Sequence, residues 1–232
     1  MTAVRIALVV CVGAFTSLER KSFGELMLSR PIVVATVVAA ILGEAGAGLA
    51  IGVALELFFL GSSAYGASTP EHETFAALAA SAIAARAYLP HHPAAAFALA
   101  VLFALPFARL GRRAEAAIER WHVRLVEGAR ERLETGDERA ANRRALAGLV
   151  LPALAGAAAV GTGLLLAPWA SALAHLLPPA MLKGLSWSWA LFLGVCAALS
   201  LKAIRSRKAL LLSGVAALAV LGAFALATYV GW

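Results

Sequence analysis

The chain has 232 residues, of which 62% are hydrophobic and only 14% are charged, and its mean hydropathy is +0.84. This composition excludes an ordinary soluble globular domain. The net charge of +7 does not indicate nucleic-acid binding, because 10 of the 20 basic residues lie between Arg109 and Arg144 together with 7 of the 13 acidic ones. Basic residues beside apolar segments are typical of the cytoplasmic side of a membrane protein. We therefore predict an all-α, polytopic transmembrane protein that contacts lipid and binds no nucleic acid.

Apolar runs follow one another along the chain at 4–18, 31–43, 46–62, 74–89, 93–110, 145–167, 185–203 and 209–230. Only Glu44, Ala45 and Gly46 separate the second run from the third. These runs are expected to form either a re-entrant hairpin of two short helices or two full crossings. A hairpin is possible because irregular backbone at membrane depth is tolerated where protein or water covers it. The number of spans is expected to lie between five and eight.

Three regions are expected. Residues 1–111 form an N-terminal membrane region with re-entrant or broken helices and the substrate site, 112–144 an amphipathic charged cytoplasmic connector, and 145–232 the C-terminal membrane helices. In the connector, apolar residues such as Ile118 and Leu125 recur at helical spacing, and this face is either an ordinary connector surface or a docking surface for a soluble partner. The basic cluster at 202–208 is expected on the same, cytoplasmic side.

The sequence gives no indication of a cofactor, a metal site or an enzyme acting alone. It contains no P-loop, GxSxG or HExxH pattern. Cys11 and Cys196 lie in apolar runs without a CxxC or a histidine cluster at zinc spacing, so buried free thiols are expected.

Glu56 is the most informative residue, because it lies inside the apolar segment GVALELFFLG at 52–61. An ionised carboxylate in hydrocarbon costs several kcal/mol, so such a residue usually faces a partner or a polar cavity. Gly48, Gly52 and Glu56 share one helix face, and glycines on that face would let a neighbouring helix approach closely. Glu56 is therefore predicted to lie in a helix interface, either as an acceptor for substrate hydroxyls or as an acid held by backbone amides for packing.

A polar, glycine-punctuated loop follows at 62–74. It brings together hydroxyls, acids, a histidine and the ring of Tyr65, which are suited to binding a sugar. The alternative is an ordinary helix N-terminus with Ser68 or Thr69 as its cap and Pro70 near its first position. The candidate substrate-binding residues are Glu56, Ser63, Tyr65, Glu71, His72 and Glu73, with Gly43, Glu44, Gly48 and Gly52 as structural residues around the break.

Four motifs resemble those of one known family. They are GELMLSRP at 24–31, ILGE at 41–44, GVALELFFLG at 52–61 and GASTP at 66–70. In this order they are similar to the membrane subunit IIC of mannose-family phosphotransferase systems. On this resemblance, Glu56 takes the place of the family's membrane glutamate and Glu44 that of its break aspartate.

The resemblance implies a sugar permease in a bacterial inner membrane. It would work with a sister membrane subunit, IID, and with soluble IIA and IIB proteins that carry the phosphoryl group, while a homo-oligomer is left open. The chain departs from the family's pattern at Ala64, where relatives carry an amide, and at Glu71-His72-Glu73, where they often carry a single aspartate. A transport-deficient scaffold of the same fold and an unrelated ion-coupled carrier therefore remain as alternatives.

Overall fold

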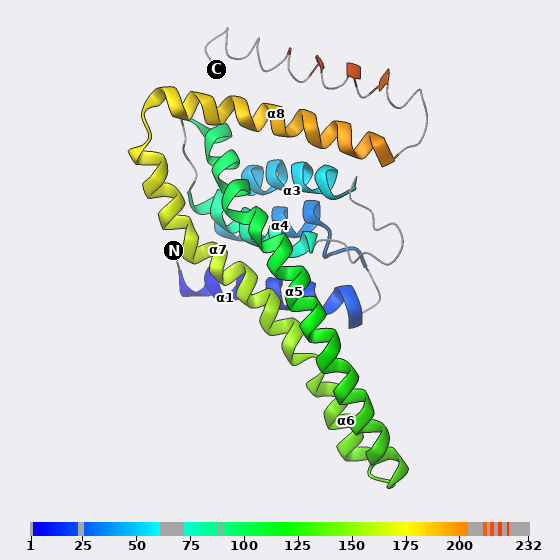
Figure 1. Ribbon diagram of the computed structural model, residues 1–232. Helices are drawn as coiled ribbons and strands as arrows, with labels where there is room; N and C mark the ends of the chain where they lie inside the picture. The colour runs from blue at the N-terminus through cyan, green and yellow to red at the C-terminus, as the bar shows by residue number, and fades with distance from the viewer. Residues whose placement is uncertain are drawn as a thin grey trace.

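The computed structural model describes residues 2–22, 26–60, 72–87, 89, 91–203 and a few positions between 211 and 222. The described residues form helices and no strand, as predicted for an all-α protein (Figure 1). The helices are α1 (Ala3–Ser22), α2 (Pro31–Leu42), α3 (Ala45–Leu60), α4 (Glu73–Arg86), α5 (Pro93–Glu134), α6 (Glu138–Ala147), α7 (Val150–Leu176) and α8 (Pro179–Ala203).

Three helical stretches in the described part of the chain are long and apolar enough to cross a membrane. They are Pro93–Glu134, Glu138–Leu176 and Pro179–Ser200. By contrast, α2 and α3 have only 12 and 16 residues, fewer than the roughly 17–25 that a full crossing needs. The number of spans stays a prediction, because residues 61–71 and 204–210 lie outside the described residues.

The helices α2 and α3 pack against each other as a hairpin, as the sequence predicted. The α2 helix ends at Gly43, which has a φ of 102° and donates its backbone N–H to Ala40 O, while Glu44 N–H bonds to Ala39 O. This is the left-handed ending in which glycine carries no steric penalty. The next helix starts at Ala45, so the break is a tight helix–helix turn.

Glycines on α3 let the hairpin close. A Cβ at Gly52 would lie 2.8 Å from Ile32 Cα, and one at Gly48 would collide with the backbone oxygen of Ala35. The predicted close approach along this face is therefore confirmed. The same device joins α7 to α4, since a Cβ at Gly163 would lie 2.8 Å from Ala79 Cα. Small residues allow such contacts where lipid supplies no hydrophobic drive between helices.

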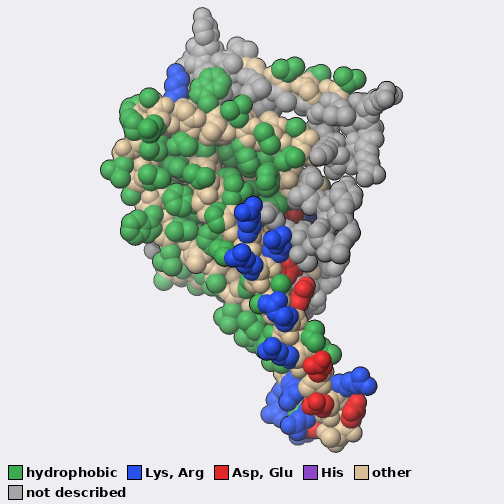
Figure 2. Space-filling model, viewed as in Figure 1, with side chains coloured by type: hydrophobic (Ala, Val, Ile, Leu, Met, Phe, Trp, Pro, Cys, Tyr) green, Lys and Arg blue, Asp and Glu red, His purple; other side chains and the backbone are tan. Residues whose placement is uncertain are grey.

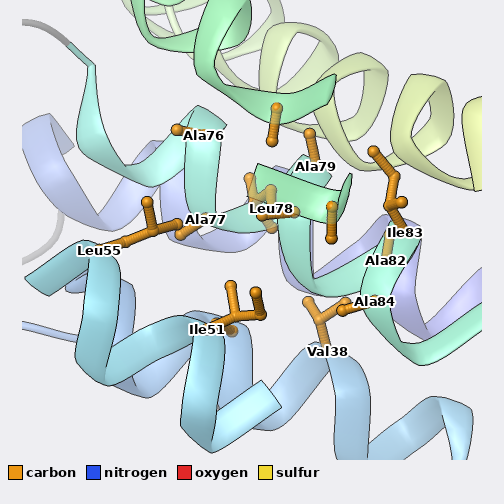
Figure 3. Packing of buried hydrophobic residues seen from close by; sticks show 14 of the residues in the cluster. Val38, Ile51, Leu55, Ala76, Ala77, Leu78, Ala79, Ala82, Ile83 and Ala84 are labelled. Carbon is orange, nitrogen blue, oxygen red and sulfur yellow. The ribbon is translucent and has the colours of Figure 1, made fainter. Parts of the chain in front are cut away.

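The centre of the molecule is α4. Its residues 74–85 are all buried, and it packs against α2, α3, α5 and α7. Figure 3 shows Ala77 of α4 beside Leu55 and Ala84 beside Val38 of the hairpin, with Leu78 and Ile83 of α4 in the same buried cluster. A helix that is apolar on every side is typical of a buried position, and its many alanines let four neighbours approach it.

The end of α5 and the helix α6 extend away from this apolar body (Figure 1). The 42 residues of α5 give it a length of about 63 Å. Figure 2 shows the charged side chains gathered on this extension and the hydrophobic ones on the body. Because α5 is continuous from Pro93 to Glu134, the expected boundary between residues 111 and 112 falls inside one helix.

Two details of the sequence prediction are wrong. The cap of α4 is His72, whose Nδ1 accepts the backbone N–H of Phe75, and not Ser68 or Thr69. Cys196 is buried as expected, but Cys11 is exposed on α1, because it faces outward on a helix that packs through its opposite side.

Candidate functional site

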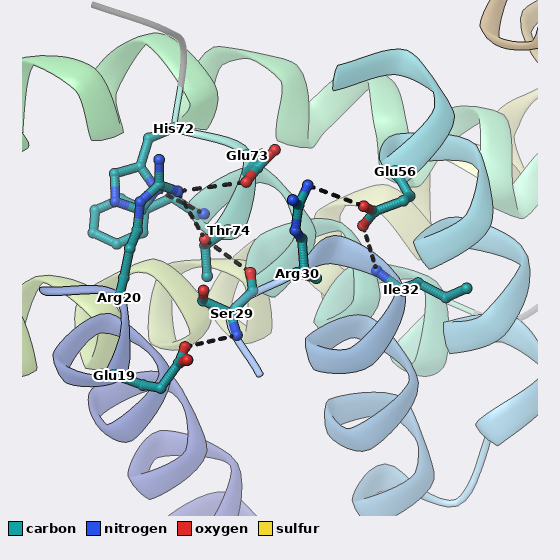
Figure 4. A network of polar contacts seen from close by, with 10 residues as sticks. Glu19, Arg20, Ser29, Arg30, Ile32, Glu56, His72, Glu73 and Thr74 are labelled. Atoms are coloured by element: carbon teal, nitrogen blue, oxygen red, sulfur yellow. Dashed lines mark hydrogen bonds and ion pairs between the residues drawn. The ribbon is translucent and has the colours of Figure 1, made fainter. Parts of the chain in front are cut away.

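Polar side chains from four segments meet at one place (Figure 4). They come from the end of α1, from the turn at 26–30 before α2, from the second half of α3 and from the first turn of α4. The residues are Glu19, Arg20, Ser29, Arg30, Glu56, His72, Glu73 and Thr74. We call this set the polar junction.

Glu56 lies where the sequence predicted, in the interface between α3 and the start of α2. Its Oε1 accepts a hydrogen bond from Arg30 Nη1 at 3.3 Å, and its Oε2 accepts one from Ile32 N at 3.3 Å. Its side chain is only 17% exposed. Ile32 N is one of the first-turn amides that have no partner within their own helix, so Glu56 also supports the N-terminus of α2. A carboxylate offers about four lone-pair sites, which leaves Glu56 capacity for a further donor.

A second chain of contacts joins α1, the 26–30 turn and α4. Arg20 Nη1 donates to Thr74 Oγ1 at 3.3 Å, and Thr74 Oγ1 donates to the backbone oxygen of Ser29 at 3.0 Å. Arg20 also lies 3.7 Å from Glu73 Oε1. Thr74 is fully buried, so its hydroxyl needs these two partners, one as donor and one as acceptor, because water does not reach it.

Glu19 is the most deeply buried acid among the described residues, with 0% exposure. Its Oε2 accepts the backbone N–H of Ser29 at 3.1 Å. Its Oε1 is buried and has no hydrogen-bond partner among the described residues. A hollow of about 300 Å³ adjoins it, lined by Glu19, Arg20, Met27, Ser29, Arg30 and Glu73.

His72 has a structural position in the junction. It is 5% exposed, its backbone N–H donates to Ala108 O of α5 at 3.1 Å, and its ring stacks on Phe75 with 3.9 Å between centroids. It therefore both caps α4 and joins it to α5. Gly111 on α5 leaves the space that this arrangement needs, since a Cβ there would lie 2.6 Å from His72 Cβ.

The structure brings together only part of the predicted site. Glu56, His72 and Glu73 belong to the junction, whereas Ser63, Tyr65 and Glu71 lie outside the described residues. Glu44 does not belong to the junction. It directly precedes α3 and therefore lies about 12 residues, or about 18 Å, along the helix from Glu56.

Sequence reasoning missed Glu19, Arg20, Ser29 and Arg30. The first two follow an apolar run and continue into Lys21, so they look like a solvated flank. A signal was present for Arg30, which stands in the SRP segment at 29–31, directly before the proline that starts α2. An arginine at the start of an apolar helix, with an acid in the next one, is a pair that could have been predicted.

The fold and the polar junction together define the class of protein to which the chain belongs. The chain is a polytopic helical membrane protein with a short-helix hairpin and a polar junction inside its apolar body, an arrangement typical of transporters. It belongs to the family of PTS system sorbose-specific IIC components, whose family model matches residues 2–231. This family is part of the mannose group of phosphotransferase systems, so the predicted resemblance is confirmed.

Two solved structures share the fold. One, described only as a membrane protein, has a TM-score of 0.69 and 20% sequence identity and covers 100% of this chain and 97% of its own. The other is the mannose transporter ManYZ in complex with microcin E492, with a TM-score of 0.61, 18% identity and coverage of 100% of this chain and 96% of that one. A comparison with curated proteins gave no match.

Proposed function

We propose that this chain is the sugar-translocating IIC subunit of a mannose-type phosphotransferase permease in a bacterial inner membrane. It would work with a IID membrane subunit and with soluble IIA and IIB proteins. The observation that carries the proposal is the placement of Glu56, an acid sheltered between two short helices of an apolar body and still 17% exposed. Family membership supports the same conclusion.

In this function the polar junction recognises the sugar. Glu56 accepts a hydrogen bond from a sugar hydroxyl, and Arg30, held by Glu56 at 3.3 Å, is placed to donate to a sugar oxygen. Glu73, at the start of α4, offers a second acceptor. The sequence adds Ser63, Tyr65, Glu71 and His72 as further candidates, with the ring of Tyr65 lying against the apolar face of the sugar.

The chain itself performs no phosphoryl transfer in this scheme. The phosphoryl-transfer residues are expected on IIA and IIB, and phosphorylation of the sugar by IIB would keep it inside the cell. The role of this subunit is to bind the sugar and to expose it first to the outer side of the membrane and then to the cytoplasmic side. The short α2–α3 hairpin, joined only through Gly43 and Glu44, supplies a unit that could move as one body against the longer helices.

Uptake measured in cells that express this chain with IIA, IIB and IID tests the proposal. Glu56→Gln keeps the size of the side chain but removes its charge, and Glu56→Ala removes the group. Both should lower phosphoenolpyruvate-dependent uptake at least tenfold at equal expression, since a hydrogen bond to a charged group contributes about 1.5–3 kcal/mol. Glu127→Gln, on the exposed part of α5, is the matched control and should leave uptake unchanged.

Three results would count against this function. Unchanged uptake in both Glu56 variants would remove Glu56 from the site. Absence of uptake of every sugar tested in the complete system would favour a transport-deficient scaffold. Uptake that survives loss of the phosphate carriers but stops when ion gradients are dissipated would favour an ion-coupled carrier.

A further inference from the structure

We propose that Glu19 is a second ligand-binding acid, and that the hollow beside it holds the hydroxyl-rich part of a neutral sugar. This inference rests on the proposed function and adds to it a residue and a position that the motifs around Glu56 do not contain. The ligand hydroxyl would donate to Glu19 Oε1 while the guanidinium groups of Arg20 and Arg30 donate to neighbouring ligand oxygens.

The first observation is the unsatisfied oxygen. Glu19 is 0% exposed, and its Oε1 has no hydrogen-bond partner among the described residues, although Oε2 is bound by Ser29 N at 3.1 Å. A buried polar atom without a partner is costly and rare in native proteins. For a carboxylate oxygen this cost is larger still, because moving a charged group out of water costs more free energy than moving a neutral polar group. The presence of this oxygen indicates a donor that arrives from outside the described chain.

The second observation is the space beside it. The hollow of about 300 Å³ is bordered by Glu19 itself and by Arg20, Met27, Ser29, Arg30 and Glu73. Its size is at the lower end of the roughly 300–1,000 Å³ range of small-molecule sites. The arginines of its lining offer donors and the glutamates offer acceptors. Met27, which is 64% exposed, offers an apolar surface for the carbon face of a sugar.

The charges select the class of ligand. Glu19 and Glu73 are the acids of the lining and Arg20 and Arg30 its bases. Both arginines already face an acid, Arg20 facing Glu73 and Arg30 facing Glu56. A neutral ligand with many hydroxyls adds hydrogen bonds without adding a charge. A sugar phosphate would bring negative charge to arginines that acids already occupy, which is unfavourable.

Arg30 connects this hollow to Glu56. It lines the hollow and donates to Glu56 Oε1 at 3.3 Å, so one guanidinium lies between the two acids. Figure 4 shows Glu19 and Glu56 on opposite sides of the 29–32 segment, which supplies a backbone N–H to each of them. A ligand in the hollow would therefore lie beside Glu19, and it would reach Glu56 only through Arg30.

Ligand binding to the purified membrane complex of this chain with its IID subunit tests the inference. Isothermal titration with a panel of neutral hexoses first identifies a sugar that the wild-type complex binds. Glu19→Gln is then compared with Glu131→Gln, a control on the exposed part of α5. The glutamine keeps an acceptor for Ser29 N and removes the charge. We expect at least a tenfold loss of affinity in Glu19→Gln and no change in the control.

A set of monodeoxy analogues of that sugar makes the test specific. One analogue, lacking the hydroxyl that reaches Glu19, should bind the wild type at least tenfold more weakly than the parent sugar. The Glu19→Gln variant should bind this analogue almost as well as it binds the parent sugar. Should Glu19→Gln fail to fold, Glu19→Asp keeps the charge, withdraws the carboxylate by one methylene and should show the same selective loss.

The outcomes separate the two proposals. Equal affinity of the wild type and Glu19→Gln for a bound sugar, with no analogue distinguishing them, would overturn the role of Glu19 and leave the proposed function intact. Tighter binding of an amino sugar or a sugar phosphate than of any neutral hexose would overturn the ligand class. Failure of the wild-type complex to bind any hexose would overturn the proposed function, and the inference with it.

Discussion

Buried hydroxyl and carboxyl groups decide how the helix ends meet in this protein. Thr74 donates to Ser29 O at 3.0 Å and accepts from Arg20 at 3.3 Å, so a single hydroxyl joins α1, the turn before α2 and α4. The first two segments follow one another closely in the chain, whereas α4 is more than 40 residues away from both, since Thr74 and Ser29 are 45 residues apart. The hydroxyl therefore contributes to the position of α4 as well as to its local stability.

Thr74→Val should destabilise the protein by about 1–3 kcal/mol, because Ser29 O loses the donor that the fully buried Thr74 hydroxyl supplies, while the shape of the side chain is kept. Thermal or denaturant unfolding in detergent micelles measures the difference. The control is Thr162→Val in α7, since the Thr162 hydroxyl bonds only to carbonyls of its own helix, Ala158 O and Ala159 O. That variant should differ from the wild type by less than about 0.5 kcal/mol. Equal effects at both positions would contradict the bridging role of Thr74.

At the residue scale, the sequence predicted some of the junction and missed the rest for a physical reason. Glu56 could be predicted because an acid inside an unbroken apolar run has no solvent to face. Glu19 could not, because it stands beside Arg20 and Lys21 at the end of a run and looks solvated. Its burial depends on the fold of the 26–30 turn, whose Ser29 binds it, and on the approach of α4, which begins more than 50 residues later.

At the element scale, the α2–α3 hairpin could be predicted from local signals alone. Pro31 starts α2, Gly43 ends it with a positive φ, and the two helices are too short to cross a bilayer. The central position of α4 could not be predicted in the same way. Its alanine-rich sequence has no apolar stripe, so nothing in it shows which side faces a neighbour, and in the structure every side does.

Gly48→Ala should destabilise the hairpin by about 1–3 kcal/mol, because the added methyl group would meet backbone atoms of α2 that cannot move aside separately. Gly46→Ala, in the same helix, is the matched control: a Cβ there has no atom within 4 Å. It should be neutral or up to about 1 kcal/mol more stable, since alanine favours a helix over glycine. Both are measured by unfolding in micelles. A Gly48→Ala protein as stable as the control would contradict the close approach of α2 and α3.

At the scale of the whole molecule, an apolar body carries a charged extension. The change occurs within α5, which is apolar up to Leu110 and charged from Arg112 onward, without a break in the helix. The sequence predicted the change of composition correctly. It did not predict the continuity, since it placed a boundary between residues 111 and 112. In the structure Gly111 lies inside α5, where its missing side chain leaves room for His72, the cap of α4. One continuous helix, which includes Pro106, therefore joins the core around α4 to the charged extension.

This arrangement predicts the orientation of the protein. The extension contains most of the basic residues of the described chain, so it should lie in the cytoplasm. The next helix, α7, has 27 residues and a length of about 40 Å, enough for one crossing. The turn between α7 and α8, at Leu177 and Pro178, should then lie on the outer side.

Two single-cysteine variants test this topology in a Cys11→Ser background, which removes the exposed native thiol and leaves the buried Cys196. Asn142→Cys places a thiol on α6 and Ala180→Cys places one at the start of α8, both at exposed positions. A membrane-impermeant maleimide should label Ala180→Cys in spheroplasts, and Asn142→Cys only in inside-out vesicles. The reverse pattern would place the extension outside the cell. Labelling of both variants in spheroplasts would mean that α7 does not cross the membrane, since a crossing helix of this length must put its two ends in different compartments.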